Sequence, residues 1–203
     1  MSVRVKICGI TTLEDARSAA ELGAAAVGFN FYRSSPRYIS PEAAARIAGD
    51  LPAGVCRVGV FVNEAREDVE AIARQVGLTA LQFHGDEPPA ACAQWDRKVI
   101  KAVRVRNEST IEAASAYAVD FILADAYVDR IFGGSGKRVE VEWLKRFAAE
   151  RLIVAGGLTA DNVAAVVRDV RPFGVDVASG IERSPGHKDP VLMRRFIENA
   201  NAA

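Results

Sequence analysis

Short, continuous apolar runs alternate along the chain with stretches in which the apolar residues fall on one helical face. The runs are unbroken rather than alternating with polar residues, as a parallel strand covered on both faces requires. The pattern predicts eight strands, at Val3–Cys8, Ala25–Phe31, Cys56–Val62, Ala80–His84, Lys98–Val105, Asp120–Asp125, Leu152–Ala155 and Phe173–Ala178.

Helix-start signals lie between the runs, because the free N–H groups of a first helical turn need acceptors. The predicted N-caps are Thr11, Ser40, Asn63, Ser109, Thr159 and Asp189. Thr11 and Ser109 are each followed three residues later by a glutamate, the pattern of a capping box. Ser40 and Asp189 each precede a proline, which suits the first helical position.

Eight strand–helix units in succession predict the α/β class, and within it a (β/α)8 TIM barrel. The chain has 203 residues, close to the lower limit of roughly 200 for this fold, so short loops are expected. No change of composition divides the sequence, and a single domain over residues 1–203 is expected. The alternative is an open, doubly wound sheet, which usually has five or six strands.

Composition narrows the possible partners and cofactors. Lysine plus arginine and aspartate plus glutamate both count 26, and the basic residues are scattered, which argues against nucleic acid as a partner. No segment approaches the roughly 20 apolar residues of a membrane span, so a soluble, cytoplasmic protein is expected. The three cysteines form no C-x-x-C pair and the two histidines no ligand motif, which favours metal-independent chemistry.

Two glycine-containing segments follow the last two strands. Barrel enzymes bind ligands at the C-terminal ends of their strands, and backbone N–H groups there often hold phosphate. Gly156 and Gly157 follow the seventh strand, and Ser179 and Gly180 follow the eighth, so a phosphorylated substrate is predicted. The alternative is that these glycines only turn the chain into the next helix.

A third glycine-rich segment follows the sixth strand and comprises Gly133, Gly134, Ser135 and Gly136 before Lys137. It is not a nucleotide-binding P-loop, because Ile131 stands where that motif needs glycine and Arg138 where it needs serine or threonine. We interpret it as a lid loop over the site. An ordinary surface loop is the alternative.

Cys8 and Asp125 end the first and sixth strands, at positions that face each other across the mouth of an eight-stranded ring. A proton acceptor and a proton donor on opposite sides of a ligand suit an isomerase. Each residue alone also has a structural interpretation, since free cysteine is often a buried apolar residue and aspartate often caps a loop.

The motifs KICGIT, GFNFYRSSPRYI, VGVFVN, LQFHGDE, LAD before GGSGK, VAGGL, VDVASGIE and PGHKD occur in this order. Together they resemble the phosphoribosylanthranilate isomerases of tryptophan biosynthesis, from residue 5 to residue 189. The resemblance implies a (β/α)8 barrel and an Amadori rearrangement without a cofactor. In that reaction N-(5-phosphoribosyl)anthranilate becomes 1-(2-carboxyphenylamino)-1-deoxyribulose 5-phosphate.

The resemblance also implies roles for individual residues. Cys8 would be the general base, Asp125 the general acid, and Arg37 the partner of the anthranilate carboxylate. The phosphate contacts would fall on Gly156, Gly157, Ser179 and Gly180, while His84, Asp86 and Asp176 are assigned only to the pocket wall or rim. Asp125 must be protonated to donate, so burial should raise its pKa. Cys8 needs thiolate character, and Lys6 lies on the same face of the strand.

Some features stay open. Residues 138–143 read RVEVEW where relatives usually have a Phe-Asp-Trp segment, and the roles of Asn30, Asp129 and Arg130 are not predicted. The related isomerase of histidine biosynthesis is a rival, but it uses two aspartates, where this chain has Cys8. A metal-dependent pentose-phosphate epimerase and a non-catalytic phosphate-binding module are further alternatives. The sequence leaves open a monomer or a homodimer.

Overall fold

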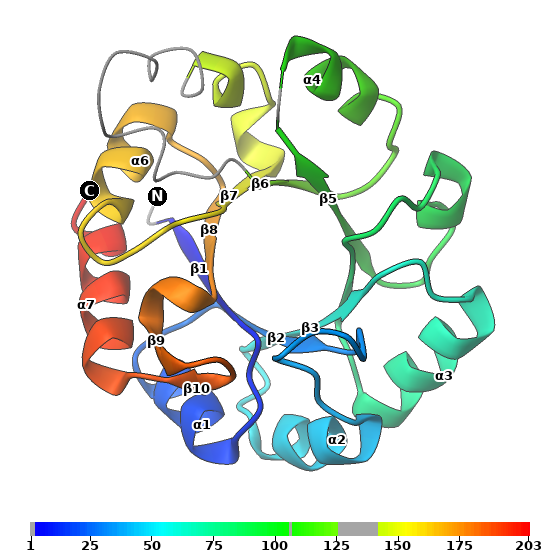
Figure 1. Ribbon diagram of the computed structural model, residues 1–203, viewed down its shortest axis with the longest axis vertical. Helices are drawn as coiled ribbons and strands as arrows, with labels where there is room; N and C mark the ends of the chain where they lie inside the picture. Colours follow the sequence, from blue (N-terminus) through cyan, green and yellow to red (C-terminus); the bar gives the residue numbers. More distant parts are fainter. Residues whose placement is uncertain (1–2, 106, 126–141) are drawn as a thin grey trace.

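Eight parallel strands close into a barrel in the order β1 to β8, with β1 paired to β8 (Figure 1). The structure is a computed structural model that describes residues 3–105, 107–125 and 142–203. The strands are β1 Arg4–Cys8, β2 Ala26–Asn30, β3 Cys56–Phe61, β4 Ala80–Phe83, β5 Lys98–Arg104, β6 Phe121–Asp125, β7 Leu152–Ala155 and β8 Gly174–Val177. Each lies within one residue of its predicted bounds. The barrel prediction is confirmed, and the open sheet is wrong.

Helices form an outer ring around the strands (Figure 1). They are α1 Leu13–Glu21, α2 Pro41–Asp50, α3 Arg66–Val76, α4 Glu108–Ala114, α6 Val163–Val170 and α7 Pro190–Asn201. Short 3-10 helices occur at η1 Pro89–Cys92, η3 Ala149–Arg151 and η4 Ser179–Ile181. A single turn of 3-10 helix, η1, joins β4 to β5, with Pro89 at its first position. No helix in these described ranges is long and apolar enough to cross a bilayer.

Two of the predicted helix caps are confirmed. The Ser40 side chain accepts a hydrogen bond from the Ala43 N–H at the start of α2. The Asp189 carboxylate accepts from the N–H groups of Val191 and Leu192 at the start of α7. Proline at the first helical position follows both caps, as predicted.

The other four cap predictions are wrong. The N-caps are Thr12 for α1, Asn107 for α4, Ala65 for α3 and Asn162 for α6, and the last two make no side-chain cap. Thr11 is not a cap because its hydroxyl donates to the Gly186 carbonyl instead. Asn63 has a φ of 53°, and its side-chain oxygen accepts from the Asp86 N–H. These long-range contacts take priority over the local capping pattern.

The barrel encloses a small apolar interior beneath a charged layer. Its buried residues are Val58, Ala80, Ile100, Ala102, Leu123, Ile153 and Ala155. A larger apolar core fills the space between the strands and the helices. The ion pair between Lys6 and Asp176 is also buried, on neighbouring strands β1 and β8.

A short hairpin is added to the eight units between β8 and α7. Its strands are β9 Glu182–Ser184 and β10 His187–Lys188. Lys188 lies opposite Glu182 in the antiparallel pairing. The hairpin is fastened to the rest of the barrel, since the Lys188 N–H donates to Asp15 in α1 at 3.2 Å.

Replacing a confirmed cap should destabilise the fold measurably. We expect Ser40→Ala to lower the free energy of unfolding by about 1 kcal/mol, the usual cost of losing a serine N-cap. Ser109→Ala is the matched control, because Ser109 is exposed and does not cap α4. It should change stability by less than about 0.5 kcal/mol. Urea denaturation measures both, and equal losses would contradict the assignment of the caps.

Candidate active site

A cavity of about 270 Å³ lies at the C-terminal ends of the strands. Almost every residue that the sequence assigns to the site and that the structure describes lines it. These residues are Cys8, Arg37, His84, Asp125, Gly156, Gly157, Asp176, Ser179 and Gly180, and they are joined by Asn30 and Gln82. Asp86 is the exception, because its side chain is exposed and outside the cavity.

A larger hollow of about 930 Å³ lies at the opposite end of the molecule. It is lined by residues such as Val3, Arg171 and Phe173, and by none of the predicted site residues. Barrel enzymes carry their chemistry at the C-terminal ends of the strands, whereas the other end contributes to stability. The smaller cavity is therefore the candidate active site.

Cys8 lies beside a buried ion pair. The Lys6 ammonium is 2.8 Å from the Asp176 carboxylate, and the two residues are direct partners in the β1–β8 pairing. Gly28 on β2 leaves room for these groups. A Cβ atom on Gly28 would lie 2.9 Å from the Cys8 sulfur and 3.1 Å from the Lys6 nitrogen. The sulfur and the nitrogen are therefore at most 6.0 Å apart.

The electrostatic surroundings of Cys8 act in opposite directions. Burial raises the pKa of the Cys8 thiol above its ordinary value, while the Lys6 ammonium lowers it and Asp176 raises it again. Burial by itself would lower the pKa of Lys6, but the Asp176 carboxylate and Cys8 together outweigh burial and raise it. Lys6 is thus a permanent cation close to the thiol. It limits the effect of burial on Cys8 without cancelling it.

Asp125 ends β6 on the other side of the cavity and faces His84. The His84 Nε2 atom is 4.0 Å from an Asp125 carboxylate oxygen, which is too long for a direct hydrogen bond. Burial lowers the pKa of His84, so the imidazole is neutral at pH 7 and the contact is not an ion pair. The fully buried Gln82 side chain lies 3.0 Å from His84 Nδ1 and orients the ring.

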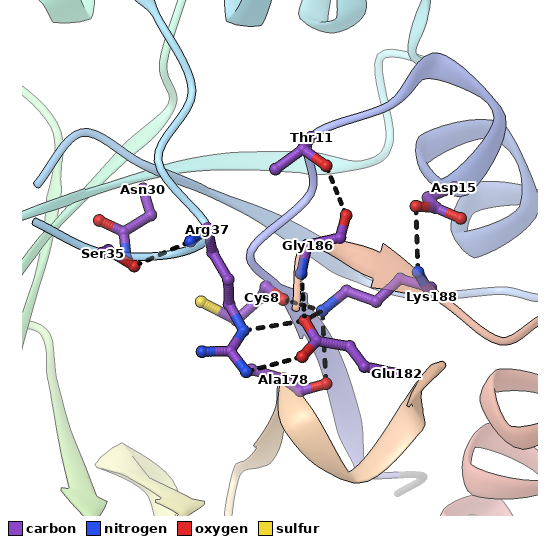
Figure 2. A network of polar contacts seen from close by, with 10 residues as sticks. All are labelled: Cys8, Thr11, Asp15, Asn30, Ser35, Arg37, Ala178, Glu182, Gly186 and Lys188. Carbon is purple, nitrogen blue, oxygen red and sulfur yellow. Dashed lines mark hydrogen bonds and ion pairs between the residues drawn. The ribbon is translucent and has the colours of Figure 1, made fainter. Parts of the chain in front are cut away.

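Arg37 is held by a carboxylate that the sequence did not single out. Its Nε and Nη2 atoms donate to the two Glu182 oxygens at 2.8 and 2.6 Å (Figure 2). The hydrogen bonds to Glu182 raise the pKa of Arg37. Burial alone would raise the pKa of Glu182, but the hydrogen bonds from Arg37 and Lys188 hold it below its ordinary value. Glu182 is therefore ionised at neutral pH.

Asn30 supports the loop that carries Arg37. Its amide nitrogen donates to the Ser35 hydroxyl at 3.1 Å, and its oxygen accepts from the Tyr32 N–H at 2.9 Å. The Ser35 hydroxyl also accepts from the Arg37 N–H at 3.1 Å. The polar residue at the end of β2 is thus a satisfied amide of the cavity wall.

The glycine segments after β7 and β8 meet at the cavity. Gly156 and Gly157 have φ values of 89° and 66°, in the left-handed region that favours glycine. A Cβ atom on Gly180 would overlap the Leu158 carbonyl, so these two loops touch. This close approach leaves two stretches of backbone exposed to the same cavity, which suits an anionic ligand.

The predicted lid loop, Gly133 to Gly136, lies outside the described residues, as do Asp129 and Arg130.

A cavity with paired glycine segments at the C-terminal end of a closed parallel barrel is typical of enzymes that convert small phosphorylated substrates. That is the class of protein that this fold and this site define. Residues 5–199 match the family described as N-(5'phosphoribosyl)anthranilate (PRA) isomerase, and the chain belongs to that family.

Similar proteins agree with the family match. The chain is 50% identical over 200 residues to N-(5'-phosphoribosyl)anthranilate isomerase of Citrifermentans bemidjiense, with 97% of this chain and 96% of that protein covered. It is 47% identical over 203 residues to the enzyme of the same name from Trichlorobacter lovleyi, with 99% of both chains covered.

Solved structures show the same likeness. Phosphoribosyl anthranilate isomerase from Thermotoga maritima has a TM-score of 0.90 and 48% sequence identity, over 99% of this chain and all of that one. A second structure of such an isomerase was solved with reduced 1-(o-carboxyphenylamino)-1-deoxyribulose 5-phosphate bound. It has a TM-score of 0.86 and 45% identity, over 99% of this chain and all of that one.

Removing the Lys6 charge should make the Cys8 thiol less acidic. We expect Lys6→Met to move the midpoint of the pH dependence of Cys8 alkylation upward by about one pH unit or more. The sign follows because the thiolate loses a neighbouring cation and Asp176 loses its partner. Iodoacetamide labelling followed by mass spectrometry of the Cys8 peptide measures the rate at each pH.

Lys101→Met is the matched control for this change. Lys101 is also buried and paired, with Glu87 at 2.7 Å, but it does not line the cavity of Cys8. It should leave the Cys8 midpoint unchanged. The assignment fails if Lys6→Met and Lys101→Met give the same midpoint.

Proposed function

We propose that this isomerase converts N-(5'-phosphoribosyl)anthranilate by general acid–base catalysis, with Cys8 as the base and Asp125 as the acid. The observation that carries the proposal is that a thiol, a carboxyl group and two glycine segments line one cavity. The substrate needs these three things, since its ring must open, its C2 proton must move and its phosphate must be held. Family membership supports the same reaction.

The first step opens the furanose ring. The protonated Asp125 carboxyl donates its proton to the ring oxygen as the bond between C1 and that oxygen breaks. The nitrogen lone pair of the arylamine forms the new C1–N double bond, which leaves a protonated imine and an Asp125 carboxylate. His84 faces Asp125 and is held by Gln82. Because His84 is neutral, it forms no ion pair with the Asp125 carboxylate.

The second step moves the proton from C2. The Cys8 thiolate takes the C2 proton, the electrons of that bond form a C1–C2 double bond, and the imine nitrogen becomes an uncharged amine. The resulting enolamine tautomerises to the ketone. The protonated imine is itself the electron sink, so the proposal includes no cofactor. It also places a positive charge near Cys8, which favours the thiolate at the moment it is needed.

The remaining contacts fix the substrate between the two catalytic groups. In our proposal Arg37 binds the anthranilate carboxylate, while Gly156, Gly157, Ser179 and Gly180 bind the phosphate. His84 and Asp176 form the wall between them. Two charged ends held at opposite sides of the cavity would place C1 and C2 between Cys8 and Asp125, which is how positioning lowers a barrier.

The histidine-pathway isomerase is the nearest alternative reaction, and it expects an aspartate at the position of Cys8. A non-catalytic phosphate-binding module would bind ligand without turnover.

We further propose one domain over residues 1–203, a cytoplasmic location, and a monomer or homodimer without nucleic acid or membrane partners. A solved structure of a relative from Thermotoga maritima is of monomers generated from a dimeric isomerase.

Removing either catalytic group should abolish most of the turnover. We expect Cys8→Ala and Asp125→Ala each to lower kcat by at least roughly 100-fold, the low end for general acid or base catalysis. Substrate can be generated in situ from anthranilate, and the loss of its fluorescence after addition of protein measures the rate. Full activity in one variant would remove that residue from the mechanism.

Cys56→Ala provides the matched control for the cysteine variant. Cys56 is also a free, half-buried cysteine on a strand, but it does not line the active-site cavity. We expect its kcat to stay within about twofold of wild type, because surface and structural changes away from the site leave chemistry intact. No turnover by the wild-type protein would favour the non-catalytic alternative.

Arg37→Ala should weaken substrate binding more than it slows chemistry. The loss of a carboxylate contact made in both ground and transition states raises KM with little change in kcat. We expect KM to rise at least about tenfold. Arg33→Ala is the control, because Arg33 is exposed on the same loop and does not line the cavity. An unchanged KM for Arg37→Ala would contradict the carboxylate contact.

A further inference from the structure

Arg37 faces an electrostatic difficulty as a carboxylate-binding residue. Two of its nitrogens already donate to Glu182, and the Glu182 side chain is only 5% exposed. An arginine paired in this way is neutralised by its partner. A substrate carboxylate approaching the pair would be attracted by Arg37 and repelled by Glu182 at nearly the same distance.

Lys188 changes this balance. Its side chain is completely buried, and its ammonium lies 2.8 Å from the same Glu182 oxygen that accepts from Arg37 Nε (Figure 2). Glu182 is ionised, since its pKa lies below its ordinary value. Two cations therefore share one anion, and the cluster of Arg37, Glu182 and Lys188 carries a net charge of one positive unit.

The other hydrogen bonds of Lys188 reach the catalytic strands. The ammonium donates to the Cys8 carbonyl at 2.6 Å and to the Ala178 carbonyl at 3.3 Å. Together with Glu182 these acceptors use all three of its N–H donors. Cys8 ends β1 and Ala178 directly follows β8, so Lys188 joins the two strands where their own pairing stops after Ile7 and Val177.

The hairpin fixes Lys188 in this position. Lys188 on β10 and Glu182 on β9 are direct partners in the antiparallel pairing. The Gly186 carbonyl between them accepts from the Thr11 hydroxyl, and the Lys188 N–H donates to Asp15. These contacts tie the hairpin to α1 and to the loop before it, so the ammonium is held before any ligand binds.

We propose that Lys188 is a positioning residue for the isomerisation, which keeps the Arg37–Glu182 pair cationic and fixes Arg37 relative to Cys8 and the phosphate segment. The inference rests on the proposed function, because Arg37 is taken to bind the substrate carboxylate. Lys188 does not touch the substrate itself. It acts through Glu182 and through the two carbonyl groups.

The test uses four proteins whose clusters differ in charge. The wild-type cluster carries one net positive charge, Lys188→Met leaves none, Glu182→Gln leaves two, and the double variant restores one. The probe is reduced 1-(o-carboxyphenylamino)-1-deoxyribulose 5-phosphate, the ligand bound to a relative. Calorimetry gives its dissociation constant without any turnover.

We expect Lys188→Met to raise the dissociation constant at least about tenfold, and the double variant to recover a substantial part of this loss. A purely structural role predicts the opposite, since the double variant removes more hydrogen bonds than Lys188→Met does. Lys101→Met is the control for the loss of a buried, paired lysine and should bind the probe like wild type.

The inference is overturned if Lys188→Met binds the probe within twofold of wild type, or if the double variant binds no better than Lys188→Met. If Lys188→Met does not fold, the comparison of Glu182→Gln with wild type tests the inference. Glu182→Gln adds a positive charge to the cluster, so a dissociation constant more than about twofold above that of wild type would contradict the inference. A failure of the proposed function can be told apart from a failure of this inference. In that case the wild-type protein would bind the probe but would not consume the substrate.

Discussion

The pairing of β1 with β8 closes the barrel, and the whole arrangement of the site depends on it. This pairing places Lys6 beside Asp176, and it brings the Cys8 end of β1 next to Ser179 and Gly180, the segment that we propose to bind phosphate. Residues at opposite ends of the sequence thereby face one cavity. An open sheet with the same strands would leave the Cys8 thiol and the segment after β8 on separate edges.

Buried charge is concentrated at this junction, and each charge has a partner. Isolated buried ions are strongly unfavourable, so they persist only when paired and hydrogen-bonded. Lys6 is paired with Asp176, and Lys188 with Glu182 and two carbonyl groups. Lys6 and Lys188 are therefore held as paired cations close to a site whose proposed ligand carries a carboxylate and a phosphate. The same cations limit the rise in the pKa of Cys8 that burial causes.

The strands could be predicted because burial on both faces gives each one a continuous apolar run, and residues at their C-terminal ends follow from the barrel geometry. The partner of Arg37 could not be predicted, because Glu182 is 145 residues away along the chain and no local pattern indicates the pair. Lys188 and Cys8 are 180 residues apart. The caps failed for the same reason, since Thr11 has the right local pattern but a distant carbonyl takes its hydroxyl. The sequence drew attention to Lys6, two residues before Cys8, and to Asp176 as a pocket residue, but nothing local showed that the two form an ion pair.

The central claim is that the family's ligand occupies the cavity at Cys8. Protection of the three cysteines from iodoacetamide tests it directly, with the reduced product analogue present at saturation and each peptide quantified by mass spectrometry. Cys56 and Cys92 do not line the cavity and act as internal references. We predict that the analogue slows the labelling of Cys8 and leaves that of Cys56 and Cys92 unchanged. Labelling of Cys8 at the same rate with and without the analogue would contradict the account.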